Sequence, residues 1–244
     1  MAWLAGLREA FGTKLLVTIF CAIHLPKGFV GGGGSSGLLG NAIEFAYRSY
    51  GVSGPDLQVY TSVALLPWSM KATLGVLSDG FPLMGYKKVS YLLLFTALAT
   101  LAYVLLGVGL LHREPHDASQ WPPLPVVTIG FFCLYLQMAL SDLLIEAHYS
   151  DKMRSDPQRG PDLATFVWGG MYAAGLVASA VAGGLIDAVG PAACYLLAAP
   201  FAAAVAVPAL RNLLDETPVA GATRCCQADG DIWRGKVTAE RTVS

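Results

Sequence analysis

The chain has 244 residues, of which 55% are hydrophobic and 14% are charged. Soluble globular proteins carry about 25% charged residues, so this composition excludes an ordinary soluble domain and indicates a protein embedded in lipid. The five cysteines are scattered along the chain, so no disulfide framework or metal site is indicated. The net charge of −1 gives no reason to expect a nucleic-acid partner, and we expect none.

The first hydrophobic segment runs from about residue 13 to residue 46, after a short amphipathic lead-in at residues 1–12. It is interrupted at residues 24–30, and again by the glycine-rich stretch at 31–37. Glycine disfavours a helix by about 1 kcal/mol per residue relative to alanine. The glycines therefore predict either a broken helix, as is tolerated beside a cavity, or a helix held together by close packing.

Five further apolar segments follow, and each is long enough to cross a hydrocarbon core that needs about 20 residues. They span approximately residues 57–79, 90–111, 126–149, 163–186 and, after a tight turn at Gly190-Pro191, the stretch up to residue 214. Pro67 should kink the first of them. We expect a charged loop from Asp151 to Asp162, and a disordered tail over residues 215–244.

The cations are distributed unevenly between the two sides of such a six-helix arrangement. With the N-terminus inside, the cytoplasmic segments hold Arg8, Lys14, Lys87, Lys88, Lys152, Arg154, Arg159, Arg211, Arg224, Arg234, Lys236 and Arg241. The opposite side holds Arg48 and Arg113. This asymmetry follows the positive-inside rule and predicts that both termini are cytoplasmic. The expected fold is an all-α, polytopic bundle of six transmembrane helices over residues 13–214.

The stretch at residues 66–91 carries the most distinctive pattern. An apolar run containing Lys71 passes through Gly-x-x-Ser-Asp into a short loop, from which the chain re-enters the bilayer. The pattern resembles the signature of the folate-biopterin transporter family, a branch of the major facilitator superfamily. The matching residues are Pro67, Trp68, Lys71, Gly75, Ser78, Asp79, Gly85, Tyr86 and Tyr91. Lys87 and Lys88 stand where the family usually has two arginines, and Ala72 stands where it usually has proline.

The resemblance implies a twelve-helix transporter in which two six-helix halves move by alternating access about a site near the midplane. This chain corresponds to the first half, so we expect a truncated or half-length member, or one that pairs with a second copy or another half-transporter. The implied substrates are folate, biopterin or related pteridines, with protons as the coupling ion. The glycine-rich stretch at 31–37 is a departure from the family pattern.

Charged side chains within the spans are the candidates for substrate binding or coupling, because a charge at mid-bilayer costs roughly 2.5–3.5 kcal/mol on insertion scales. Asp142 and Glu146 are four residues apart and share a helix face, so one should be protonated or paired with a cation such as Lys71. Lys27 is a further candidate, for binding a carboxylate of the substrate. Trp68 is a candidate for stacking on a flat ring of the substrate. The alternatives are a structural ion pair, an interfacial Glu146, a snorkelling Lys27 and a packing role for Trp68.

The loop after Lys71 has a different expected role. By the resemblance, Gly75, Asp79, Gly85, Lys87 and Lys88 form a gating loop that latches the second helix against the other half of the transporter. The alternative is a cytoplasmic turn whose lysines only set the topology.

Two classes of function remain: a proton-coupled pteridine transporter, and a non-transporting membrane partner that assembles with or regulates a full-length transporter. An enzyme is not expected, because the spans contain no His-Glu-x-x-His or Gly-x-Ser-x-Gly motif. No cofactor is expected. The plasma membrane is the expected location, with an organelle membrane as the alternative.

Overall fold

The computed structural model describes residues 2–31, 37–112 and 121–218 of the chain. These residues form helices and, apart from one isolated bridge between Leu83 and Tyr86, no β-structure. In chain order the helices are α1 (Ala2–Ile19), the π-helix η1 (Phe20–Gly31), α2 (Gly37–Arg48), α3 (Gly54–Ser69), α4 (Lys71–Gly80), α5 (Val89–Leu111), α6 (Leu124–Ser155), α7 (Gly160–Ala188), α8 (Ala192–Ala203) and α9 (Ala206–Leu210).

Five helical stretches among the described residues are long and apolar enough to cross a membrane. They are Ala2–Gly31, Val89–Leu111, Leu124–Ser155, Gly160–Ala188 and Ala192–Leu210. The helix expected over 57–79 is present as two consecutive shorter helices, α3 and α4. The expectation of an all-α membrane helix bundle is therefore confirmed.

The first hydrophobic segment is divided more often than the sequence suggested. The expected lead-in is helical as far as Gly12, whose dihedral angles (φ 80°, ψ 155°) kink α1. A π-helix with Pro26 inside it then occupies residues 20–31. The helix ends at Gly31 (φ 95°) and α2 starts at Gly37 (φ 71°), so these flanks favour the broken-helix alternative. Residues 32–36 lie outside the described residues.

Pro67, which was expected to kink its helix, lies inside α3, and Met70 separates α3 from α4 three residues later. Proline has no backbone N–H, so it cannot continue the hydrogen-bond ladder of the helix. The N–H of Met70 is shared between the carbonyls of Leu66 and Pro67, at 3.2 Å each, and Met70 leaves the helical conformation (φ −88°, ψ 2°). Lys71 therefore becomes the first residue of a new helix.

The predicted length of the charged loop, from Asp151 to Asp162, was wrong, because the actual connection is shorter. α6 continues to Ser155 and α7 already begins at Gly160, so only residues 156–159 connect the two helices. Pro161 suits the first turn of α7, where its missing N–H leaves no bond unmade. The Asp156 carboxylate accepts a hydrogen bond from the N–H of Arg159 at 3.2 Å and closes this short turn.

Helix α6 is the central element of the bundle. It contacts α3, α4, α5, α7 and η1, and its middle is buried almost all round. η1 packs closely against α7, where a side chain on Gly28 would meet the carbonyl oxygen of Met171 at 2.7 Å. Nε2 of His24 donates a hydrogen bond to the carbonyl oxygen of Phe166 across the same contact, at 3.0 Å. This contact fixes the position of the η1 side chains relative to α7.

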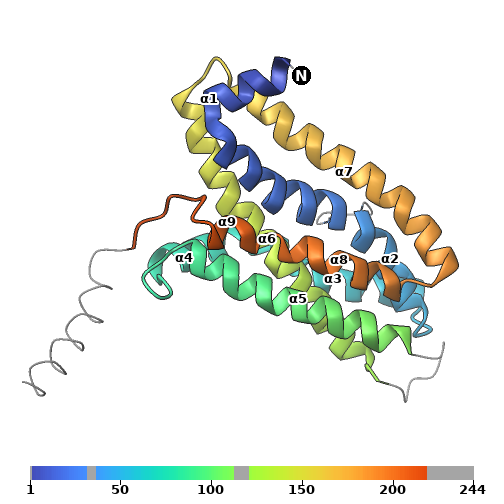
Figure 1. Ribbon diagram of the computed structural model, residues 1–244. Coiled ribbons are helices and arrows are strands. Elements are labelled where there is room, and N and C mark those ends of the chain that lie inside the picture. The colour runs from blue at the N-terminus through green and yellow to red at the C-terminus, as the bar shows by residue number, and fades with distance from the viewer. Residues whose placement is uncertain (1, 32–36, 113–120, 219–244) are drawn as a thin grey trace, which may run out of the picture.

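Both described ends of the chain lie at the same end of the bundle. Figure 1 shows α1, α4, α9 and the α6–α7 connection together at that end, with α2 and the α7–α8 turn at the other. The ammonium of Lys14 pairs with the carboxylate of Asp215 at 3.1 Å. Glu216 accepts hydrogen bonds from the N–H groups of Lys87, Lys88 and Val89, at 2.7–3.2 Å. The described start of the predicted tail, residues 215–218, thus covers the N-terminus of α5.

We predict that Glu216→Ala lowers the free energy of unfolding by about 1 kcal/mol, because it removes the anionic cap from α5. Glu216→Gln should have a smaller effect, because the amide still accepts hydrogen bonds. The measurement is chemical unfolding in detergent, followed by far-UV circular dichroism. Lys14→Ala is the control, since its ion pair is solvent-exposed and should contribute little. Equal effects of Glu216→Ala and Lys14→Ala would contradict the capping role.

Candidate functional site

Four charged side chains meet inside the bundle. Asp142, on α6, accepts from Nζ of Lys27 at 2.9 Å through Oδ1 and from Nζ of Lys71 at 2.8 Å through Oδ2. Lys71 also reaches Oε2 of Glu146 at 3.3 Å. The structure therefore joins η1, α4 and α6 through one charge cluster, which we define as Lys27, Lys71, Asp142 and Glu146.

The local backbone explains why these side chains meet. Asp142 and Glu146 are one helical turn apart and point from the same face of α6. Lys71 begins α4 immediately after the break at Met70, and α4 packs against α6. Lys27 follows Pro26 in the π-helix η1, which also contacts α6. Lys27 thus lies in a π-helix and Lys71 at the first residue of an α-helix that follows a break, while both carboxylates lie within the long helix α6.

The two carboxylates occupy different environments. The Asp142 side chain is only 5% exposed and each of its oxygens has its own lysine. The Glu146 side chain is 46% exposed and is bound through one oxygen to Lys71, the longest contact of the cluster. Two positive and two negative charges balance when all four groups are ionised. Removing one partner from such a buried pair typically costs 3–5 kcal/mol.

Two tryptophans accompany the lysines. The ammonium groups of Lys27 and Lys71 each lie 5.6 Å from the ring centroid of Trp68. Lys27 is also 5.1 Å from the ring of Trp168, on α7. All five residues predicted for substrate binding or coupling are therefore brought together. The sequence did not single out Trp168, although a tryptophan within a helix rich in small residues is a signal that could have been used.

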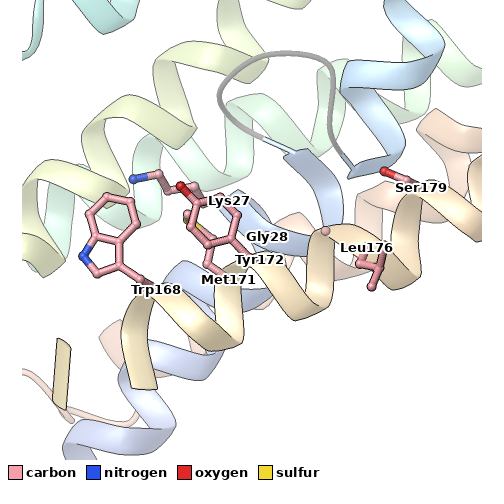
Figure 2. A pocket seen from close by; sticks show the side chains of 8 residues that line it. Lys27, Gly28, Trp168, Met171, Tyr172, Leu176 and Ser179 are labelled. Carbon is pink, nitrogen blue, oxygen red and sulfur yellow. The ribbon is translucent and has the colours of Figure 1, made fainter. Parts of the chain in front are cut away.

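A cavity opens beside the charge cluster, between η1 and α7. Its volume is about 430 Å³. It is lined by Lys27, Gly28, Trp168, Met171, Tyr172, Gly175, Leu176 and Ser179 (Figure 2). The lysine marks one end of the cavity, and α7 contributes most of its lining, including the large side chains of Trp168 and Tyr172. Such a cavity is within the size range of small-molecule sites.

The residues predicted to form the gating loop lie apart from the cluster, along α4 and in the turn before α5. Asp79 is exposed and makes no ion pair with any residue that the structure describes. A Cβ added at Gly75 would be in ordinary contact with Leu143, at 3.5 Å. Gly85 adopts a positive φ of 82° in the turn that precedes Lys87 and Lys88. The gating role of these residues stays a prediction.

Comparison with known proteins agrees with the motif at 66–91. The BT1 family matches residues 33–224, which is most of the chain. The probable folate-biopterin transporter 4 of Arabidopsis thaliana is 26% identical over 183 residues, covering 74% of this chain and 34% of the relative. The chain thus spans about a third of the length of this curated relative. No solved structure matches the chain significantly. The chain is a multi-pass membrane protein and belongs to the BT1 family.

Proposed function

We propose that this protein takes part in the transport of folate, biopterin or related pteridines across a membrane, by alternating access and with proton coupling. The observation that carries the proposal is the charge cluster of Lys27, Lys71, Asp142 and Glu146 inside the bundle. Intramembrane ionisable residues of this kind face the bundle interior and mark substrate or proton pathways. The family membership supports the same substrate class.

The balance of charges gives proton coupling a physical reason. An anionic substrate needs a cation, but Lys71 is already neutralised by Asp142 and Glu146. Protonation of Glu146 would remove one negative charge and release Lys71 toward a substrate carboxylate. Asp142 is the less suitable proton acceptor, because both of its oxygens are held by lysines. In this mechanism, substrate and proton enter together, and the proton offsets one negative charge of the substrate.

Alternating access requires a second body against which this bundle can move. We propose that a second six-helix unit packs against this bundle. The exposed Asp79 and the uncrowded Gly75 support a contact of α4 with that unit. The shared location of Lys14 and Asp215 supports termini on one side, which we take to be the cytoplasmic side of the plasma membrane.

The alternative is a non-transporting partner that assembles with a full-length transporter. Membership of the BT1 family is compatible with both functions. A measurement of transport by this chain alone distinguishes them.

We predict that cells expressing this chain take up labelled folate or biopterin in a saturable manner. Lys71→Met should reduce that uptake by about tenfold or more, because it leaves Asp142 and Glu146 without their shared cation. Lys14→Met is the control, since this lysine lies at the bundle end in an exposed pair. Surface expression of each variant must be equal. Absence of uptake by the wild-type chain, with the protein in the membrane, would favour the partner function.

We also predict that Glu146→Gln separates substrate exchange from proton coupling. A permanently neutral side chain mimics the protonated glutamate, so exchange should persist while pH-driven accumulation is lost. Asp142→Asn should instead abolish both, because it leaves two lysines with a single carboxylate. The measurement is uptake into vesicles with and without a pH gradient. Accumulation by Glu146→Gln that still follows the gradient would contradict this assignment.

A further inference from the structure

Two large aromatic side chains stand on α7 in a helix otherwise rich in glycine and alanine. Trp168 is 44% exposed and Tyr172 is 68% exposed. They are one turn apart, with ring centroids separated by 6.3 Å and ring planes inclined by 29°. Both line the cavity between η1 and α7, and Figure 2 shows their rings rising from α7 toward Lys27.

The position of Lys27 indicates which side of the bundle this aromatic pair faces. The ammonium of Lys27 lies 5.1 Å from the Trp168 ring centroid and is paired with Asp142. Charged side chains within membrane spans face the bundle interior or a water-filled cavity and avoid lipid. Trp168 therefore borders a polar space, and its exposed surface is available to a solute.

We propose that Trp168 and Tyr172 bind the flat heterocyclic ring of the substrate by stacking, inside the cavity between η1 and α7. This inference rests on the proposed function and adds residues that recognise the ring. Aromatic faces bind planar heterocycles in proteins through stacking that tolerates variation in the ring substituents. Lys27, at the same end of the cavity, is positioned for a polar or anionic substituent of the bound ring.

Trp68 is less suited to the same task. It is packed against the buried core, and its indole Nε1 is buried with no hydrogen-bond partner among the described residues. The centroid of the Trp68 ring lies 5.6 Å from the ammonium groups of both Lys27 and Lys71. We therefore assign Trp68 to the support of the charge cluster, and Trp168 to contact with the solute.

The cavity has room for a ring on this aromatic pair. Its volume of about 430 Å³ is in the range of small-molecule pockets. Gly28 and Gly175 add no side chain to its lining, and Ser179 lies at the far end, about 16 Å along α7 from Trp168. A fused bicyclic ring stacked on Trp168 therefore leaves space for a substituent that extends toward Ser179.

The test is binding of biopterin, a planar and fluorescent probe, to the full chain purified in detergent. Trp168→Ala and Tyr172→Ala should each raise the dissociation constant by about tenfold. Trp168→Phe and Tyr172→Phe keep a ring and should change it by less than about threefold. Val177→Ala is the matched control, because Val177 is 56% exposed on the same helix but does not line the cavity.

A second readout is the fluorescence of the bound ring, which a stacked indole quenches. Trp168→Phe should weaken this quenching even where affinity is kept, so it remains informative if Trp168→Ala fails to fold. Wild-type-like affinity of both alanine variants would overturn the aromatic assignment and leave the transporter proposal standing. A folded wild-type chain that binds neither biopterin nor folate would overturn both proposals.

Discussion

The double ion pair of Asp142 is the constraint on which the rest of the structure depends. One buried carboxylate holds a lysine on each oxygen, and the lysines come from η1 and α4. The two cations make it possible for Asp142 to remain charged in the bundle, and Asp142 in turn fixes the positions of both lysines. Three helical segments that are far apart in the sequence are therefore held in one arrangement by a single side chain.

The irregular backbone around this cluster has a consequence for movement. Both lysines lie beside breaks in regular helix structure, Lys27 in a π-helix after Pro26 and Lys71 directly after Met70. Breaks of this kind are tolerated in membranes where they line a cavity, and they allow the two parts of a helix to move separately. In the proposed mechanism, a change in the charge of Glu146 would therefore act on Lys71, at the start of α4.

Much of this architecture could be predicted from the sequence because hydrophobic length, proline and helix periodicity are local signals. Pro67 predicted an irregularity in its helix, which the structure shows as two consecutive helices, and the spacing of Asp142 and Glu146 predicted their shared face. The contact of Lys27 with Asp142 could not be predicted with the same ease, because it joins residues 115 positions apart across an irregular helix. Trp168 was missed for a related reason, since nothing local shows which face of its helix borders a cavity.

The central claim is that an anionic substrate brings a proton with it, because the lysines of the charge cluster are already balanced by Asp142 and Glu146. Calorimetric titration of folate into the purified chain, in two buffers of different ionisation enthalpy, measures that proton directly. The account predicts net uptake of about one proton per folate bound, and its loss in Glu146→Gln. Folate binding with no proton uptake by the wild-type chain would contradict it.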